Sequence, residues 1–133
     1  RDDRVTWLVC FYATWSSKSN DFAPVFAELS NKYGDLSNFK FAKLDCNLFP
    51  DVANRFNIST SSFTKQFPTV VLFQKGQEVK RRPFIDSKGN IFDFIFSYEN
   101  VVKEFDLNKI YYECKQNPIQ VKSTNNPQAK KDD

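Results

Sequence analysis

The segment from Trp7 to Pro24 constrains the fold of this chain more than any other part of the sequence. Residues Trp7–Ala13 are apolar and aromatic and lack the polar alternation of a one-sided sheet, which predicts a central strand covered on both faces. A tryptophan and the start of a helix follow directly. Ser16 and Ser19 lie at that start, where a serine side chain satisfies amide groups that have no partner within the helix.

An apolar stripe with helical spacing predicts the helix itself. The stripe consists of Phe22, Val25, Phe26, Leu29 and Tyr33. Pro24 lies inside this helix and predicts a kink, because proline removes a backbone donor and crowds the preceding turn. Gly34 supplies the C-terminal stop.

Four more regular elements are predicted in the middle of the chain. Phe39–Asp45 is a predicted strand, and Pro50–Phe56 is a short helix that begins at a proline. Together with the preceding strand and helix they form a βαβα run, in which the strands normally pair in parallel. Thr69–Gln74 and Gln77–Lys80 flank a Lys-Gly turn and predict an antiparallel hairpin.

The C-terminal part is less regular. Residues 91–96 are apolar without a clear period, so their type stays open. Ser97 and Asp106 are candidate N-caps for one or two terminal helices. From Gln116 onward the sequence is rich in Asn, Pro, Gln and Lys and has no periodicity, which predicts disorder. We therefore expect one domain over residues 1–115 and a disordered tail over residues 116–133.

Composition narrows the class of protein. The net charge is only +3, and part of it lies in the tail, so no nucleic-acid partner is expected. No apolar stretch approaches the roughly 18 to 20 residues of a membrane span, so membrane contact is expected through sequence outside this chain. The cysteines, Cys10, Cys46 and Cys114, form no close-spaced pair, which favours a reducing compartment over a disulfide framework. We expect no cofactor and no metal site.

In order and spacing, these features resemble the thioredoxin fold family across Val5–Lys115. The matching pieces are Val9–Trp15, the two serines at the positions of the family's Cys-x-x-Cys pair, Pro24, Ala42-Lys43-Leu44, Phe67-Pro68-Thr69 and the Phe73–Glu78 hairpin. The resemblance implies an α/β, thioredoxin-like fold. Its central mixed sheet combines a parallel βαβ part with an antiparallel hairpin and is flanked by helices.

Within that family, the resemblance is strongest to membrane-anchored members of the endoplasmic reticulum. These share a serine at the first active-site position, a serine-rich insertion before the Pro-Thr pair and an Arg-Arg-Pro after the hairpin. The corresponding residues here are Arg81, Arg82 and Pro83.

The resemblance also implies a groove for extended peptides, formed by Trp15, Phe67, Pro68 and Thr69 and called the proline groove below. In the family, the bond that matches Phe67–Pro68 is cis and exposes backbone against which a peptide pairs, and this docking needs no cysteine. Two alternatives stay open. Pro68 opens an ordinary edge strand, or Trp15 serves only for packing.

Ser16 and Ser19 exclude dithiol exchange through their positions. Exchange needs one thiolate to attack and a second thiol to resolve the mixed disulfide, whereas a serine hydroxyl holds its proton up to a pKa of about 15 to 16. The chain has no histidine, so the usual base that activates a serine nucleophile is missing. No catalytic residue is predicted, and the hydroxyls are expected to cap the helix.

Cys10 and Cys114 are the candidate redox-sensitive thiols. By the resemblance, Cys10 replaces a buried acid and Lys43 matches a lysine beside it. One hypothesis is that Lys43 lowers the pKa of Cys10 and makes its thiol sensitive to peroxide, although burial acts in the opposite direction. Cys10 and Cys46 are expected on opposite faces of the sheet, which disfavours a bond between them. Cys114, near the end of the last helix, is expected as an exposed thiol for contacts between molecules.

Two sequence signals disagree on localisation. Lys130 and Lys131 form a Lys-Lys-x-x terminus, a retrieval signal of endoplasmic reticulum membrane proteins with a cytosolic tail. Asn57-Ile58-Ser59 is an N-glycosylation sequon and points to the lumen. The tail and the unpaired cysteines favour a cytosol-facing domain on the endoplasmic reticulum membrane. Glycosylation of Asn57 would reverse that orientation.

We therefore predict a redox-inactive, thioredoxin-like domain of an endoplasmic reticulum membrane protein. It is expected to bind proteins or extended peptides, with homodimers as one expected assembly, and to regulate redox state, protein folding or organelle contacts. One alternative is a disulfide oxidoreductase whose native cysteine pair has been replaced by Ser16 and Ser19. Another is a structural scaffold whose proline groove is closed by residues 59–66.

Overall fold

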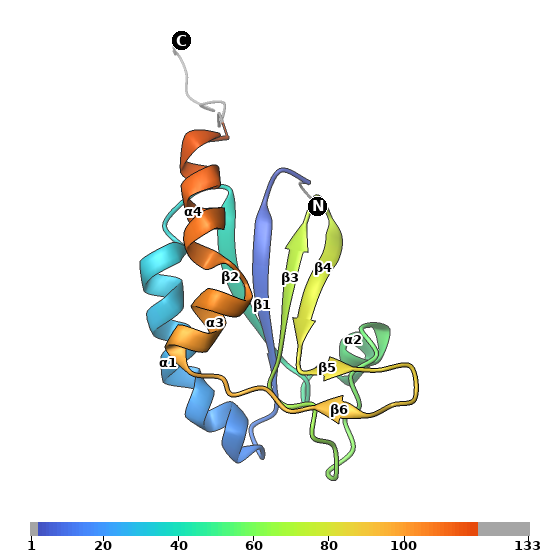
Figure 1. Cartoon of the computed structure of the whole chain (residues 1–133). Helices are drawn as coiled ribbons and strands as arrows, with labels where there is room; N and C mark the ends of the chain where they lie inside the picture. Colours follow the sequence, from blue (N-terminus) through green and yellow to red (C-terminus); the bar gives the residue numbers. More distant parts are fainter. Residues whose placement is uncertain (1–2, 120–133) are drawn as a thin grey trace.

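The computed structural model describes residues 3–119 and contains a four-stranded mixed sheet (Figure 1). The strands are β1 (Thr6–Tyr12), β2 (Phe39–Asp45), β3 (Thr69–Gln74) and β4 (Gln77–Arg82), in the order β2-β1-β3-β4. β1 pairs in parallel with β2 and antiparallel with β3, and β3 pairs antiparallel with β4. The predicted central strand, the parallel βαβ unit and the antiparallel hairpin are confirmed.

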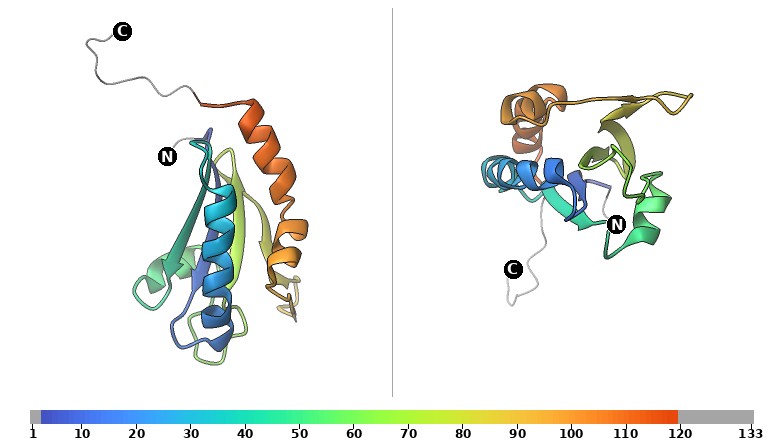
Figure 2. Two further views of the ribbon diagram at one scale, coloured as in Figure 1. Left: turned by 90° about the vertical axis from the view of Figure 1, so that its left-hand side faces the viewer. Right: turned by 90° about the horizontal axis from the view of Figure 1, so that it is seen from below.

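The described helices cover the two faces of the sheet unequally (Figure 2). α1 (Ser17–Tyr33), α3 (Tyr98–Glu104) and α4 (Leu107–Gln116) lie on one face, and the short α2 (Pro50–Arg55) lies on the other. A six-residue helix is about 9 Å long and a seven-residue strand about 23 Å, so α2 covers only part of its face. None of the helices in the described part is long and apolar enough to cross a membrane.

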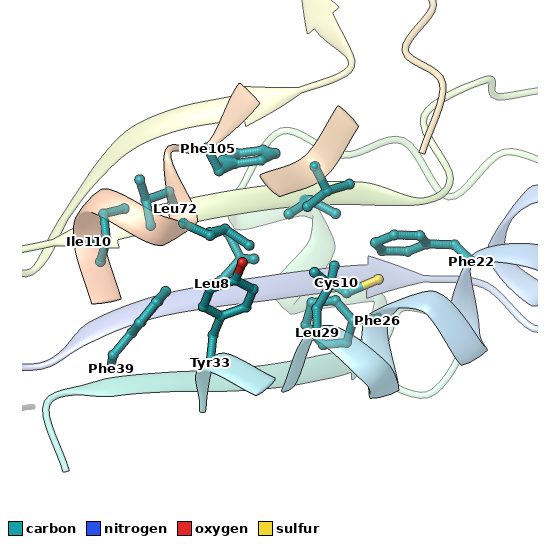
Figure 3. Packing of buried hydrophobic residues seen from close by; sticks show 13 residues of the cluster. Leu8, Cys10, Phe22, Phe26, Leu29, Tyr33, Phe39, Leu72, Phe105 and Ile110 are labelled. Carbon is teal, nitrogen blue, oxygen red and sulfur yellow. The ribbon is translucent and has the colours of Figure 1, made fainter. Parts of the chain in front are cut away.

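The main core lies between the sheet and the helices α1, α3 and α4 (Figure 3). Its residues from α1 are Phe22, Phe26, Leu29 and Tyr33. Val25 packs at its margin, so the predicted apolar stripe is confirmed. A second cluster fills the other face of the sheet, where it reaches α2.

The ends of α1 lie where the sequence predicts them. Ser16 is the N-cap, the helix continues through Pro24, and Gly34 is the C-cap. Gly34 has a φ of −94°, so the helix does not end through a left-handed residue. A side chain at this position would instead bring a Cβ within 2.6 Å of the carbonyl oxygen of Ser30, which explains the glycine.

A small hairpin follows β4, and its second strand begins residues 91–96, whose type the sequence analysis left open. β5 (Phe84–Ile85) and β6 (Ile91–Phe92) pair antiparallel in a separate two-stranded sheet. Ser97 caps α3 as predicted, because its Oγ accepts a hydrogen bond from the amide of Asn100 at 3.1 Å. Asp106 precedes α4 as predicted but adopts a left-handed φ of 53°, and its side chain makes no capping bond. The predicted side-chain cap at Asp106 is therefore wrong.

The end of α4 is fastened beside the start of β2. Asn38 is 5% exposed, and its side-chain amide donates to the carbonyl oxygens of Cys114 at 3.0 Å and of Asn117 at 2.9 Å. Carbonyls in the last turn of a helix have no partner within the helix, so Asn38 satisfies groups that would otherwise need water. α4 ends at Gln116, and most of the tail predicted from that residue lies outside the described residues.

Candidate functional site

Two serine hydroxyls build the junction between β1 and α1. The Oγ of Ser16, the N-cap, accepts a hydrogen bond from the amide of Ser19 at 3.1 Å. The Oγ of Ser19 accepts a bond from the amide of Ala13 at 3.3 Å. Both serines are buried, so these bonds satisfy amides that water does not reach. Ser16 thus caps α1 as predicted, whereas Ser19 ties the helix to the end of β1.

Ser16 also joins this junction to the predicted proline groove. Its hydroxyl donates to the carbonyl oxygen of Phe67 at 3.3 Å, across 51 positions of sequence. The Phe67–Pro68 peptide bond is cis, as the resemblance implied. The ring of Trp15 meets the ring of Phe67 edge-on, with centroids 5.6 Å apart and an interplanar angle of 86°. The structure therefore brings Trp15, Ser16, Phe67 and Pro68 into one site.

Most of the proline groove is buried. Trp15 is 44% exposed, whereas Phe67 is 4% and Thr69 1% exposed, and Pro68 is also buried. Thr69 begins β3, and its hydroxyl donates to the carbonyl oxygen of Gln66. Within the described part of the chain, the amide of Phe67 has no hydrogen-bond partner. The site thus combines one exposed aromatic ring with an unpaired backbone donor beneath it.

Gln66 organises the loop of residues 59–66 beside this site. Its Oε1 accepts a bond from the amide of Ser59 at 2.9 Å, and its Nε2 donates to the carbonyl oxygen of Asn57 at 3.3 Å. Gln66 is buried, whereas Phe63 in the same loop is 91% exposed. The role of Gln66 was not predicted, because a glutamine within a polar stretch is typical of a solvated loop.

Other contacts at the start of α1 were not predicted either. Lys18 pairs with Asp93 at 3.2 Å, and the ring of Phe96 packs on that of Phe22 with centroids 5.1 Å apart. These contacts place the segment after β6 beside the start of α1. The Arg82–Pro83 peptide bond, just before β5, is also cis, which was not predicted. The apolar run of residues 91–96 was the only sequence signal for this packing.

The structure separates the candidate thiols from the proline groove. Cys10 lies in the main core and Cys46 in the cluster on the other face, as predicted, and all three cysteines are free. Burial and, to a smaller extent, the nearby Cys46 raise the pKa of Cys10 against the opposing effect of Lys43, to a net value of about 12. The pKa of Cys10 is therefore raised overall, whereas a thiolate activated by Lys43 would need a lowered pKa. Burial likewise raises the pKa of Cys46 to about 11.

Cys114 is less accessible than predicted. It is half-buried at the margin of the main core, and its Sγ lies 3.8 Å from the carbonyl oxygen of Asn38. Burial raises its pKa, and a hydrogen bond with the side chain of Thr6 opposes this. Cys114 is therefore partly exposed, because it lies on the side of α4 that packs against the main core, and its role as a thiol for contacts between molecules stays a prediction.

We expect native thiol labelling to be confined to Cys114. The raised pKa keeps the Cys10 thiol protonated at pH 8, and burial blocks the reagent as well. Iodoacetamide at pH 8, followed by mass spectrometry, should modify Cys114 first and reach Cys10 and Cys46 only in guanidinium. A Cys114→Ser variant serves as the control and should stay unmodified while native. Rapid native labelling of Cys10 would restore the hypothesis of an activated thiol.

Three further predicted positions concern localisation. Lys130 and Lys131 lie outside the described residues. Asn57 follows α2, is exposed, and has a left-handed φ of 58°. Within residues 3–119, no group of three or more His, Cys, Asp and Glu side chains is arranged to hold a metal ion.

Comparison with known proteins assigns this architecture to a family. The family model described as Thioredoxin matches residues 1–96. The chain belongs to the thioredoxin family. A crystal structure of reduced thioredoxin pre-protein from Schistosoma mansoni has a TM-score of 0.54 and 24% identity, covering 80% of each chain, and it shows the shared thioredoxin fold.

Among curated members of the thioredoxin family, the chain is similar to membrane and endoplasmic reticulum proteins. It is 52% identical over 114 residues to the thioredoxin-related transmembrane protein 2 homolog of Drosophila melanogaster. The matched region covers 86% of this chain and 42% of that protein. It is 37% identical over 78 residues to endoplasmic reticulum resident protein 44 of Bos taurus, covering 56% of this chain and 18% of that protein. The chain thus spans about two fifths of the length of the transmembrane relatives it matches.

Proposed function

We propose that this thioredoxin-family domain binds partner proteins as extended peptides at the proline groove and does not exchange disulfides. The observation that carries the proposal is the double role of Ser16, which caps α1 and donates to the carbonyl oxygen of Phe67. The hydroxyl holds the helix start and the loop before β3 together at a site that contains no sulfur. The hydrogen bonds of Ser16 therefore hold the proposed docking site together without any thiol.

The absence of exchange follows from the chemistry of the side chains in the described domain. A hydroxyl with a pKa of about 15 to 16 neither attacks a disulfide nor resolves a mixed one. Cys10 and Cys46 do not replace the missing pair, because burial raises the pKa of both thiols and they lie in different core clusters. We infer that a bound peptide leaves this domain chemically unchanged.

Docking is supported by the exposed ring of Trp15 and the unpaired amide of Phe67. An extended peptide offers a carbonyl oxygen to a backbone amide and an apolar side chain to an aromatic ring, so one strand satisfies both. The burial of Phe67 and Pro68 favours a second candidate function, a scaffold whose groove is closed by residues 59–66. The two functions differ in whether Trp15 contributes to binding.

We expect substitution of Trp15 with alanine to weaken peptide binding about ten-fold, the usual effect of removing a central aromatic contact. Ligands are first selected on an array of random peptides of about 15 residues, the length of an extended strand with flanks. Their affinities for the original domain and the Trp15→Ala variant are then measured by fluorescence anisotropy of labelled peptides. Tyr112→Ala, which removes a 65% exposed ring from α4, is the matched control and should leave affinity unchanged.

Two results would contradict docking at the proline groove. Ligands that bind the Trp15→Ala variant as tightly as the original domain would place the binding surface elsewhere. An array without any ligand would favour the scaffold.

We further propose that the domain belongs to an endoplasmic reticulum membrane protein and faces the cytosol, where it regulates redox state, protein folding or organelle contacts through its partners, including a second copy of itself. The names of its relatives support the membrane and the organelle. The free cysteines of the described domain support the orientation. A glycan on Asn57 of the intact protein would reverse it.

A further inference from the structure

An exposed apolar patch lies on the β5–β6 hairpin and on the segment that follows it. Phe84 is 51%, Phe92 53% and Ile95 74% exposed. The rings of Phe84 and Phe92 pair across the two strands, with centroids 5.8 Å apart. We call these three residues the hairpin patch. Large apolar side chains that cluster on a surface usually mark a binding site, whereas single ones need no explanation.

The hairpin patch is fixed in place by the residues around it. The carboxylate of Asp86 closes the turn between β5 and β6, because its Oδ1 accepts hydrogen bonds from two amides of that turn at 2.9 and 2.8 Å. The side-chain amide of Asn100 donates to the carbonyl oxygen of Ile95 at 3.0 Å. Phe94 and Phe96, on either side of Ile95, pack against the main core. A partner would therefore meet a surface that is already ordered, which lowers the entropic cost of binding.

One strand of the hairpin starts at the end of the domain that holds the proline groove. Val70–Arg82 is the last pair of the β3–β4 ladder. Pro68 precedes Val70 by two residues and Phe84 follows Arg82 by two, so both lie at the same end of that ladder. Figure 1 shows β5 and β6 at this end of the sheet, where β1 also runs toward α1.

The other strand returns along the start of α1. Asp93 directly follows Phe92, and its carboxylate accepts a hydrogen bond from the ammonium group of Lys18 at 3.2 Å. Lys18 lies in the first turn of α1, three residues after Trp15. The ion pair thus places the hairpin patch beside the helix start that follows Trp15, the exposed ring of the proline groove. The two apolar surfaces are continuous at this point.

The charges that border the hairpin patch are paired. Arg82 pairs with Glu104, and Asp93 pairs with Lys18. A surface whose bordering charges are already satisfied is complementary to uncharged side chains more than to charged ones. The partner that fits the hairpin patch therefore brings apolar side chains.

Two other occupants fit this surface less well. A lipid bilayer is disfavoured because residues 86–90 at the tip of the hairpin are polar and would have to enter it first. A second copy of the chain would gain little by strand pairing, since β5 and β6 have two residues each. An extended peptide that already lies in the proline groove needs neither.

We propose that the hairpin patch is a second subsite for the peptide that docks at the proline groove, and that it selects partners with two apolar side chains in one extended segment. This inference rests on the proposed docking function, because it needs a peptide held at Trp15. An extended strand points alternate side chains to the same face, so a single segment places one apolar side chain on Trp15 and another on Phe92. Folded proteins bury most such side chains, so the partner class is unfolded or extended polypeptide.

The test is a double-mutant cycle between the domain and peptides selected on the array of random peptides. Each apolar peptide residue is replaced by serine in turn, and affinities for the original domain, Trp15→Ala and Phe92→Ala are measured by fluorescence anisotropy. Phe92→Ala should weaken binding about five-fold and abolish the effect of serine at one peptide position. Trp15→Ala should do the same at a different position. Ile95→Ser, outside both strands, should also weaken binding, and Tyr112→Ala is the control that should not.

The outcomes separate this inference from the function on which it rests. If Phe92→Ala and Ile95→Ser bind as tightly as the original domain while Trp15→Ala loses affinity, the second subsite is overturned and docking at the proline groove stands. An array without any ligand, or unchanged binding by all three variants, would overturn both. Additive losses from Phe92→Ala and every serine replacement would also overturn the subsite, because Phe92 would then act without contacting the peptide.

Two further measurements address the other occupants. Binding of the domain to vesicles of phosphatidylcholine and phosphatidylserine that Phe92→Ala abolishes would make a bilayer the partner. A dimer in sedimentation equilibrium that the same variant dissociates would make a second copy the partner. Either result would overturn the proposal.

Discussion

Replacing both Ser16 and Ser19 with cysteine is expected to raise insulin reduction at least about 100-fold above the unaltered chain, with dithiothreitol as the electron source. A thiolate at position 16 would accept the hydrogen bond that the amide of Ser19 now donates at 3.1 Å. It would also lie at the N-terminus of α1. Both effects lower a thiol pKa from about 8.5 into the range of about 3.5 to 7.5. The second cysteine, one helical turn later, would resolve the mixed disulfide.

The controls test whether activity depends on the position of the two cysteines or only on their presence. Ser17→Cys with Asn20→Cys gives the same spacing at two exposed positions and should show little activity, because neither site has the capping geometry of Ser16. Ser16→Cys alone should form mixed disulfides that accumulate. A folded Ser16→Cys, Ser19→Cys variant without activity would show that the site lacks more than sulfur.

Phe22→Ala is expected to destabilise the domain by about 3 to 5 kcal/mol, the range found when a buried phenylalanine is truncated. Phe22 is 2% exposed and packs against Phe26 at 5.7 Å and Phe96 at 5.1 Å between ring centroids. Small domains unfold with a total of about 5 to 15 kcal/mol, so the loss is a large part of the stability. The midpoint of thermal unfolding should fall by about 10 °C or more.

Phe63→Ala is the matched control, because it makes the same chemical change at a side chain that is 91% exposed. Its effect should stay within about 0.5 kcal/mol in urea unfolding followed by far-UV circular dichroism. Equal losses for the two variants would mean that residues 59–66 pack on the domain through Phe63. A small loss for Phe22→Ala would mean that the core collapses around the missing ring.

The elements that the sequence predicted are those whose burial repeats along the chain. β1 is a continuous apolar run whose residues are all buried or half-buried, and α1 buries one stripe, so each has a pattern that local sequence reveals. β5 and β6 have two residues each, which is too short for any period. Asp106 has the composition of a cap, but its left-handed backbone directs the side chain elsewhere.

The candidate site divides in the same way. Ser16, Ser19 and Pro68 were identified because they occupy recognisable positions in a pattern of residues. Gln66 and Asp93 were not, because their roles depend on contacts that form only after folding, such as the Lys18–Asp93 pair across 75 positions of sequence. The accessibility of Phe67 and Cys114 also could not be predicted, since it depends on which neighbours cover each side chain.

The side-chain amide of Asn38 binds the carbonyl oxygens of Cys114 and Asn117 at the end of α4, and these two hydrogen bonds have a mechanical consequence. Tension applied to the chain beyond Asn117 is transmitted through two amide hydrogen bonds to the residue just before β2. The load therefore enters the domain at the start of β2 and also at the start of β1, because the amide of Thr6 donates to the carbonyl oxygen of Asn38 at 2.8 Å. A pull from the C-terminal side would first break the two hydrogen bonds that Asn38 makes to the end of α4. It would then strain the start of β2, whereas the junction of β1 and α1 would bear little of the force.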